Sequence, residues 1–352
     1  MLKAYFEFLD WTISGKSLPS GYEYKEQGEG FNLIVFGCPG SGKSTFVTKY
    51  CEEHQIEITR TTFYEDYSNS DFVGQIIPVV DEKSEKNQIS YEFHPGPFTE
   101  VLFKAYSEPY NNFALVIEEI NRGNAPAIFG DIFQLLDRTD HLSTFDIVNY
   151  NIQKYLENKF SKETDENCFF DSIKLPRNLY IFGTMNSGDQ NVFTLDTAFK
   201  RRWKFKKLKN VFLSEKDKFF IPGSKSVTWR KFAETINSFI LEYSDGIVSA
   251  EDKQLGSWFV EPELLVDKME DSCINDDVKG KIEDFSYKIF EYLWDDVAKF
   301  NRQQWFCNKI RTLEDIIGVY IKNCEEGTLD DNWNMLFSEE VCQKLNEISN
   351  VE

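Results

Sequence analysis

The chain has 352 residues, of which 41% are hydrophobic, and it carries a formal net charge of −20 at pH 7. This length is enough for one large domain or two smaller ones. Its apolar runs are shorter than the roughly 20 residues that a membrane-spanning helix needs. The N-terminal stretch carries Glu7 and Asp10 and has no small-residue cleavage site. We therefore predict a cytoplasmic protein without a membrane segment.

The negative charge argues against tight nucleic-acid binding by the chain alone, because such binding relies on Lys and Arg displacing counterions from phosphates. Residues 200–209 run against this trend, with seven basic residues in ten. Seven scattered cysteines, none paired as CxxC, and only three histidines argue against a zinc site. They indicate reduced thiols, most of them buried.

Strands and helices alternate along the first 210 residues. Residues 2–12 have apolar positions at helical spacing, and a glycine-rich linker follows. Further on, short apolar runs predict buried strands, and periodic stretches between them predict helices. The expected strands cover 32–36, 56–63, 113–117, 179–183 and 203–208, and the expected helices cover 44–53, 127–136 and 194–202. Residues 81–90 indicate a surface insertion, and residues 140–174 an irregular insertion or a hairpin.

The pattern changes near residue 228 to amphipathic helices, for example at 229–243 and 282–300. Strands that alternate with helices are typical of a parallel sheet covered on both faces. We therefore predict an α/β core with a five-stranded parallel sheet flanked by helices, followed by a small helical subdomain.

A glycine-rich loop lies between the first predicted strand and the first helix of the core. Its sequence, GCPGSGKS from Gly37 to Ser44, fits the P-loop pattern GxxxxGK[ST]. In such a loop the backbone N–H groups bind phosphate oxygens, the lysine neutralises the β- and γ-phosphates, and the serine hydroxyl ligates Mg²⁺. The predicted nucleotide-binding residues are Gly37, Pro39, Gly40, Ser41, Gly42, Lys43, Ser44 and Thr45.

Two acids, Glu118 and Glu119, directly follow the apolar strand at 113–117. Acids at the carboxyl end of a strand in a parallel sheet lie beside the phosphate site. Glu118 stands where the usual Walker B pair has Asp, and we expect it to help hold Mg²⁺ through a bound water. Glu119 is the candidate general base or water-positioning residue. The alternative is that both are solvated acids at the end of a strand.

Several motifs in a fixed order resemble the McrB-type AAA+ family, the motor subunits of modification-dependent restriction systems. Residues 118–124 (EEINRGN) resemble its DEINR(A/G)N segment, and residues 182–189 (FGTMNSGD) resemble its MNTAD signature. Residues 195–203 (LDTAFKRRW) are similar to its D-x-A-L-R-R-R-F helix. Further similarities lie at residues 62–74, 256–259 and 292–296. The resemblance spans roughly residues 30–300.

The resemblance implies further site residues. Asn186 would be a polar sensor near the γ-phosphate or the attacking water, and Asp189 would support it. One of Arg201 and Arg202 would be an arginine finger that reaches into a neighbouring subunit's site, a contribution worth ~10³–10⁵ in rate. Lys200 replaces the first of the family's three arginines, which leaves the choice between the two open.

Two more residues of the EEINRGN segment, Asn121 and Arg122, would shape the catalytic face or a subunit contact. Gln190 stands where the family has an arginine, so a charge-based role at that position is lost or moved.

The resemblance also implies an activity and partners. The chain would be a Mg²⁺-dependent GTPase or ATPase that forms a closed ring, expected to be a hexamer. It would drive an McrC-like nuclease in anti-phage DNA restriction and contact DNA indirectly through that partner. Two alternatives stay open: a protein-remodelling AAA+ chaperone without a nuclease, and a slowly hydrolysing nucleotide switch. The implied organisation is an N-terminal helix and linker (1–30), a nucleotide-binding core (31–210) and a helical lid with C-terminal helices (211–352).

Overall fold

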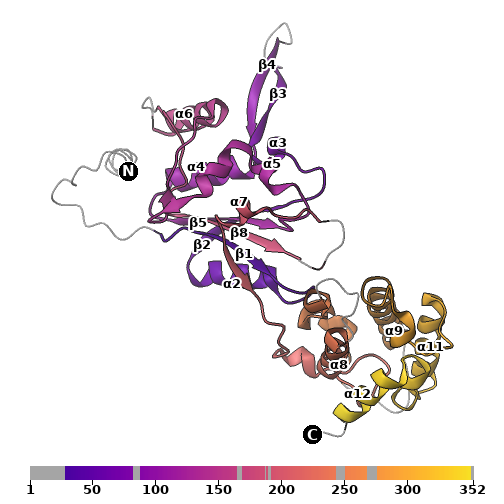
Figure 1. The fold of residues 1–352 in the computed structure, drawn as a ribbon. Helices are drawn as coiled ribbons and strands as arrows, with labels where there is room; N and C mark the ends of the chain where they lie inside the picture. The colour runs from indigo at the N-terminus through magenta and orange to yellow at the C-terminus, as the bar shows by residue number, and fades with distance from the viewer. Residues whose placement is uncertain are drawn as a thin grey trace. The chain divides into compact units, whose positions relative to one another are not determined.

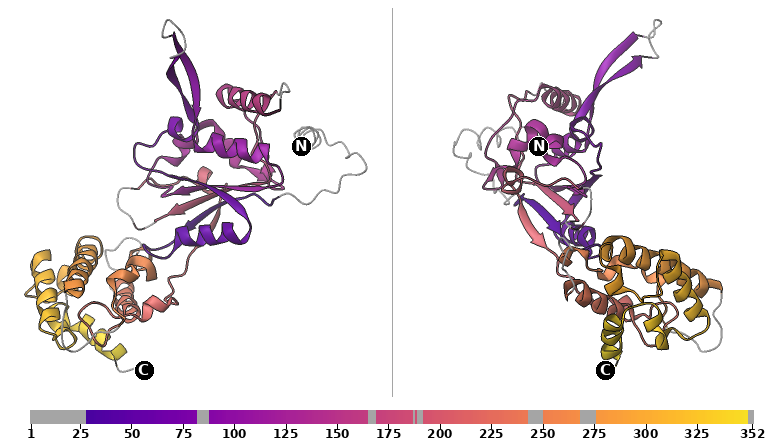
Figure 2. Two further views of the ribbon diagram at one scale, coloured as in Figure 1. Left: turned by 180° about the vertical axis from the view of Figure 1, so that it is seen from behind. Right: turned by 45° about the vertical axis from the view of Figure 1, so that its right-hand side comes forward.

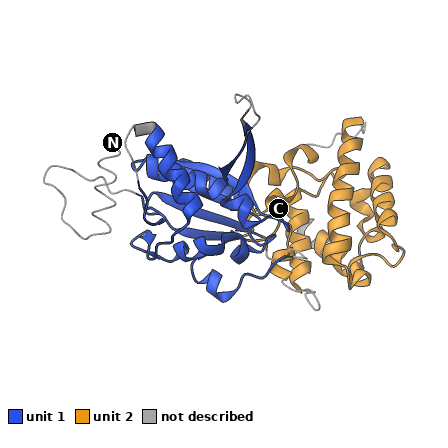
Figure 3. Ribbon diagram, turned by 90° about the horizontal axis from the view of Figure 1, so that it is seen from above, with its two compact units in different colours: residues 1–36, 44–185, 190–207 blue, residues 37–43, 186–189, 208–352 orange. Residues whose placement is uncertain are grey.

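The computed structural model describes residues 28–81, 88–164, 169–186, 188, 192–242, 250–267 and 276–349. The predicted helix at residues 2–12 lies outside them. The chain divides into two compact units (Figure 3). Unit 1 comprises residues 1–36, 44–185 and 190–207, and unit 2 comprises residues 37–43, 186–189 and 208–352.

A five-stranded parallel sheet forms the centre of unit 1, with the strand order β2-β5-β8-β1-β9. Its strands are β1 (Asn32–Phe36), β2 (Ile56–Thr62), β5 (Asn112–Glu118), β8 (Leu179–Met185) and β9 (Lys204–Lys207). The predicted parallel sheet is confirmed, and each strand begins and ends within two residues of its predicted bounds. The inner strands β5 and β8 are apolar almost throughout, as expected of strands that are buried on both faces.

Helices cover both faces of this sheet (Figure 1). Helix α2 (Lys43–Glu53) lies on one face, and α4 (Pro97–Ser107) lies on the other. Proline at the first position of α4 suits a helix start, because its fixed φ is already helical and its missing N–H would be unpaired there anyway. The short helices α3 (Asn69–Phe72) and α5 (Ala125–Phe129) pack together on the side of α4.

The predicted helix at 127–136 is wrong in its extent. Helix α5 ends at Phe129, because Gly130 adopts a positive φ of 54° that an α-helix cannot continue through. A 3₁₀ helix covers Gly130–Leu136 instead. The predicted helix at 194–202 is likewise shorter, with α7 covering Thr197–Lys200.

Two regions predicted to be insertions contain regular secondary structure among their described residues. Residues 81–90 belong in part to an antiparallel hairpin of β3 (Gly74–Asp81) and β4 (Gln88–Pro95). Residues 140–174 contain α6 (Tyr150–Thr164), and the short strands β6 (Arg138–Thr139) and β7 (Leu142–Ser143) pair just before it. The signal for α6 was sparse, because its buried apolar residues recur only once per turn, at Ile152, Leu156 and Phe160.

Unit 2 is helical, as predicted. Its main helices are α8 (Trp229–Glu242), α9 (Asp276–Glu291), α11 (Leu313–Glu325) and α12 (Glu339–Ser349), with the short α10 (Arg302–Trp305) between α9 and α11. A π-helical turn, Tyr292–Val297, ends α9 earlier than the predicted residue 300. The core of the unit is rich in aromatic residues, including Trp229, Phe232, Phe285 and Tyr320. No helix within the described part of the chain is long and apolar enough to cross a membrane.

Candidate nucleotide-binding site

The sheet order brings the predicted site segments to one edge. Strand β8 lies between β1 and β5, and all three run parallel. The P-loop follows β1, Glu118 ends β5, and Asn186 follows β8. Because the carboxyl ends of parallel strands meet at the same edge, these three segments begin side by side.

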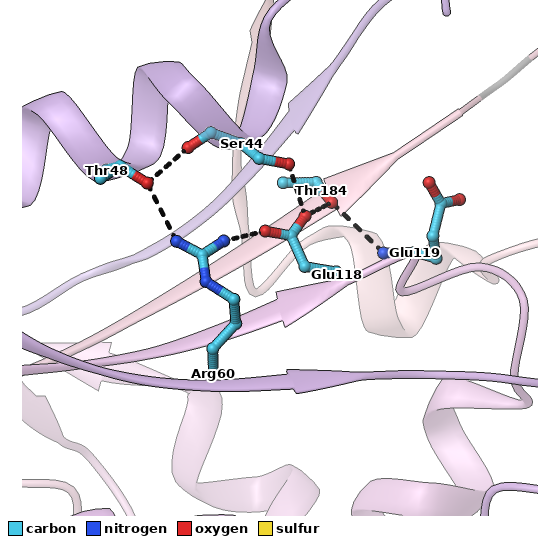
Figure 4. A network of polar contacts seen from close by, with 6 residues as sticks. All are labelled: Ser44, Thr48, Arg60, Glu118, Glu119 and Thr184. Atoms are coloured by element: carbon cyan, nitrogen blue, oxygen red, sulfur yellow. Dashed lines mark hydrogen bonds and ion pairs between the residues drawn. The ribbon is translucent and has the colours of Figure 1, made fainter.

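Glu118 is the centre of a polar network within unit 1 (Figure 4). The Ser44 hydroxyl donates a hydrogen bond of 3.0 Å to Glu118 Oε2, and the Thr184 hydroxyl donates to the same oxygen. The Arg60 guanidinium forms an ion pair with the other oxygen, Oε1. With 15% of its side chain exposed, Glu118 is therefore held at both carboxylate oxygens.

Strand register explains why these side chains meet. Thr62 of β2 pairs with Glu118 of β5, so Arg60, two residues earlier, lies on the same face of the sheet as Glu118. Thr184 follows Gly183, which pairs with Ile117, and so it neighbours Glu118 from the β8 side.

Helix α2 contributes to the same network. Arg60 Nη2 donates to Thr48 Oγ1 at 2.9 Å, and the Thr48 hydroxyl donates to the Ser44 carbonyl at 2.9 Å. Arg60 thereby links the carboxylate at the end of β5 to the first turns of α2.

The second acid, Glu119, has a left-handed backbone with φ 54°. A non-glycine residue adopts this conformation at a cost of about 1–2 kcal/mol. Its N–H donates to Thr184 Oγ1 at 3.2 Å, and its carboxylate pairs with Arg122 Nε at 3.3 Å. The sharp turn directs the Glu119 carboxylate away from the Glu118 carboxylate (Figure 4), so the two groups can have separate roles in the site. The neighbouring Asn121 is buried.

The P-loop residues 37–43 belong to unit 2. Gly40 and Gly42 have positive φ values of 74° and 84°, the region that favours glycine. Lys43 is buried, and its ammonium group donates to the carbonyl oxygens of Gly37 at 3.0 Å and Cys38 at 3.2 Å. The loop therefore curls around the lysine head group.

Within unit 2, the segment 256–259 contacts the P-loop backbone. Gly256 N–H donates to the Pro39 carbonyl at 2.9 Å, and Trp258 N–H donates to the Gly40 carbonyl at 2.8 Å. A Cβ at Gly256 would lie 2.3 Å from the Gly40 carbonyl carbon, so the two backbones can approach this closely only with glycine. The sequence did not indicate that this segment touches the P-loop.

A buried polar cluster holds the segment in place. The Ser257 carbonyl accepts from Trp229 Nε1 at 2.8 Å and from the Lys216 ammonium, which also donates to the Val260 carbonyl at 3.0 Å. The Ser257 hydroxyl donates to Asp217 at 2.7 Å. Burial lowers the pKa of Lys216. Buried hydrogen bonds therefore hold the segment 256–259 in its position against the P-loop backbone.

The two candidate finger arginines lie in different surroundings. Arg202 is 9% exposed, pairs with Asp137 at 2.7 Å, donates to the Ala198 carbonyl at 2.7 Å and stacks over the Phe133 ring at 4.0 Å. Arg201, which caps α7, is exposed. Only Arg201 is placed so that it can reach outward.

The two predicted sensor residues differ in how far they can be described. Asn186 is half-buried and directly follows β8. Asp189 lies outside the described residues.

The residues at the sheet edge fit a Mg²⁺–triphosphate complex. Mg²⁺ takes few protein ligands and keeps waters and phosphate oxygens, which suits one hydroxyl (Ser44) beside one carboxylate (Glu118). Among the described residues no group of three or more His, Cys, Asp or Glu could hold a metal by itself. Within that part of the chain, Ser41 Oγ is buried without a hydrogen-bond partner, as expected of a donor available for phosphate.

Arg60, Thr48 and Thr184 were missed at the sequence level. The one signal is Thr184, a polar residue near the end of the mostly apolar strand β8, whereas Arg60 lies in the largely polar strand β2 and Thr48 in helix α2. That signal becomes usable only once the strand order is known.

The strand order, the P-loop and the acidic pair at the end of β5 define a P-loop nucleoside triphosphatase of the AAA class. The sequence family "AAA domain (dynein-related subfamily)" matches residues 32–203. The chain belongs to this family, and it binds and hydrolyses nucleoside triphosphates as a member of it.

Two relatives are components of restriction systems. The chain is 36% identical over 324 residues to the Type II restriction enzyme BsuMI component YdiS of Bacillus subtilis (strain 168), covering 82% of this chain and 85% of the relative. It is 27% identical over 181 residues to the Type IV methyl-directed restriction enzyme EcoKMcrB subunit of Escherichia coli (strain K12), covering 49% of this chain and 34% of the relative. The resemblance to the McrB-type family is confirmed.

Proposed function

We propose that the chain is the Mg²⁺-dependent motor subunit of a restriction system. The observation that carries the catalytic part is the contact between Ser44 and Glu118, because it joins the P-loop helix to the acid at the end of β5. The restriction role is supported by the two relatives, one of which matches most of the chain.

Each residue has a separate task in this proposal. Lys43 neutralises the β- and γ-phosphates, and Ser44 and Glu118 hold the ion, which neutralises charge on the phosphate oxygens. Glu119 orients the attacking water, and its ion pair with Arg122 keeps the carboxylate in place. Asn186, with Asp189, contacts the γ-phosphate or the water.

Arg201 is the arginine finger, and it acts in the site of a neighbouring subunit. The exposure of Arg201 and the internal contacts of Arg202 support this choice. A finger in trans requires a head-to-tail arrangement of subunits that closes into a ring, which we propose to be a hexamer. The ring drives an McrC-like nuclease subunit, and DNA is cut by that partner.

The test uses the purified full chain with fluorescent GTP and ATP analogues. The variant Glu119→Gln is expected to bind nucleotide with Mg²⁺ as the natural chain does, and to lose turnover by 10²-fold or more, since a water-orienting carboxylate acts only in the chemical step. Glu53→Gln, an exposed acid in α2, is the matched control and should leave both quantities unchanged. Undiminished turnover in Glu119→Gln would show that Glu119 does not orient the attacking water. Tighter binding of one of the two analogues would show whether the protein prefers GTP or ATP.

A further inference from the structure

A cavity of about 620 Å³ lies in unit 1 between α6 and the β3–β4 hairpin, whose positions Figure 2 shows from two sides. Its volume is in the range of ligand sites, about 300–1,000 Å³. The lining combines aromatic, lysine and amide side chains. They are Ile76, Tyr91, Glu92, Phe93, Tyr150, Asn151, Lys154, Tyr155, Asn158, Lys159 and Lys162.

Aromatic rings form the two walls of the cavity. Tyr91 of β4 is 73% exposed, and Tyr150 at the start of α6 is 70% exposed. Between them, Phe93 and Tyr155 meet edge to face with their centroids 6.1 Å apart, which joins the hairpin to the helix. Large rings left open on both sides of a groove are surfaces on which a planar ligand can stack.

One face of α6 supplies the charge. Lys154, Lys159 and Lys162 are exposed and line the cavity. Lys159 and Lys162 are three residues apart and are therefore neighbours on the helix surface. From Lys154 to Lys162 the helix rises about 12 Å along its axis. Lys154 also pairs with Glu157 at 2.6 Å, and Lys159 lies 5.8 Å from the centre of the Tyr155 ring.

The sign of this charge is opposite to that of the chain. Three lysines and one carboxylate, Glu92, line the cavity, and Glu157 pairs with Lys154, so the cavity keeps a net positive charge in a protein with a net charge of −20. A cationic groove with open rings at its walls is the combination that binds single-stranded nucleic acid, because phosphates meet the cations while bases stack on the rings.

We propose that this cavity binds single-stranded nucleic acid through its phosphates and stacked bases. An acidic peptide would also satisfy the lysines, but Ile76 is the one aliphatic side chain among the lining residues, which leaves little to hold apolar peptide side chains. Asn151 and Asn158 offer amide groups to base edges or phosphates. A duplex is disfavoured because its bases are not free to stack on Tyr91 and Tyr150. The site is independent of nucleotide hydrolysis.

The experiment measures the fluorescence anisotropy of a labelled oligothymidylate of about 16 nucleotides, mixed with the full chain without GTP or ATP. Tyr91→Ala is expected to weaken binding about tenfold, as the loss of one stacked base does, and Tyr91→Trp to preserve it. Lys159→Ala/Lys162→Ala should lower the slope of log affinity against log salt by about 1.4, or about 0.7 for each lost phosphate contact.

The charge-matched control is Lys279→Ala/Lys322→Ala, which removes two exposed lysines of unit 2 and should leave the affinity unchanged. Thermal unfolding of every variant checks that the fold is intact. Absence of binding by the natural chain, or equal weakening by the control pair, would overturn the proposal. So would binding of labelled polyglutamate without binding of oligothymidylate, which would assign the cavity to an acidic protein segment.

Discussion

Arg60 and Glu118 form an ion pair between the neighbouring strands β2 and β5, near the carboxyl ends of these strands. Glu118 stands where Walker B sequences have an aspartate, and its extra methylene extends the carboxylate further from the strand. One oxygen meets the guanidinium, and the other accepts from Ser44 and Thr184. A positive charge of the protein thus lies beside the oxygens that we assign to Mg²⁺.

Replacing Arg60 by methionine should therefore strengthen Mg²⁺ binding. A fixed cation near a divalent ion repels it by about 1–2 kcal/mol at solvent-like screening. We expect the Mg²⁺ concentration that half-saturates nucleotide binding to fall about tenfold, measured with a fluorescent nucleotide at constant ionic strength. Lys49→Met removes an exposed charge of α2 and should change nothing. A higher Mg²⁺ requirement in Arg60→Met would show that Arg60 chiefly orients Glu118.

Substitution of Arg201 should affect nucleotide hydrolysis, whereas substitution of Arg202 should affect the stability of the fold. Arg202→Ala is expected to lower the free energy of unfolding by about 2–3 kcal/mol, because Asp137 loses a largely buried partner and Phe133 its stacked cation. Arg201→Ala should stay within about 0.5 kcal/mol of the natural chain, as exposed substitutions do. Its turnover should fall by about 10³-fold. Urea unfolding and steady-state hydrolysis give the two readouts, and a full turnover rate in Arg201→Ala would count against a finger at this position.

Mixed rings test whether the finger acts in trans. Arg201→Ala subunits retain an intact P-loop, and Lys43→Ala subunits retain the finger. Neither should hydrolyse nucleotide alone, but a mixture should recover part of the activity wherever an intact P-loop faces an intact finger. If mixing restores no turnover at any ratio, each site is completed within its own chain.

Gly256→Ala should weaken nucleotide binding. The added methyl group would overlap the Gly40 carbonyl carbon, so the segment 256–259 must leave its hydrogen bonds to the P-loop. We expect at least a tenfold loss of affinity, measured by nucleotide titration. Gly280→Ala in α9 is the control: nothing lies within 4 Å of the new Cβ, and helix propensity predicts a gain of about 0.5–1 kcal/mol in stability. Unchanged affinity in Gly256→Ala would mean that the loop contact does not shape the phosphate site.

The buried thiols predict a loss of stability in alkaline solution. Burial raises the pKa of Cys51 and Cys342 to about 11 and that of Cys324 to about 12. In the unfolded chain these thiols lose their protons near pH 8.5. Between about pH 8.5 and pH 11 the folded state therefore binds more protons, and the free energy of unfolding should fall by up to about 1.4 kcal/mol per pH unit for each thiol.

Chemical denaturation across this pH range measures the slope. The variant Cys51→Ala should have a shallower slope than the natural chain, because it lacks one of the linked protons. A free energy of unfolding that does not change with pH up to about 11 would contradict the raised pKa values of these thiols.

The sheet and the P-loop were predictable because their signals are local. Apolar runs such as 113–117 mark buried strands by themselves, and GCPGSGKS defines its own loop. The ion pair of Arg60 with Glu118 was not predictable, since it depends on which strands are neighbours and on their register. The same holds for Gly256, which reaches the P-loop over more than 200 residues of chain.

The hairpin escaped prediction for another physical reason. Apolar side chains of the hairpin such as Val80 and Ile89 have exposed fractions of 50% and 64%. The strands therefore lack the alternation of buried and exposed positions that identifies a half-buried strand.

The left-handed backbone of Glu119 lowers the stability of the fold at a residue that we propose to be needed for nucleotide hydrolysis. Glycine there would release the strain and raise stability by about 1 kcal/mol, since the paired Arg122 is largely solvated and its loss costs little. The same replacement removes the carboxylate that we assign to the attacking water. Selection of a variant library for heat resistance alone should therefore enrich glycine at residue 119 and yield inactive proteins, whereas selection for the restriction activity that we propose should restore the strained acid.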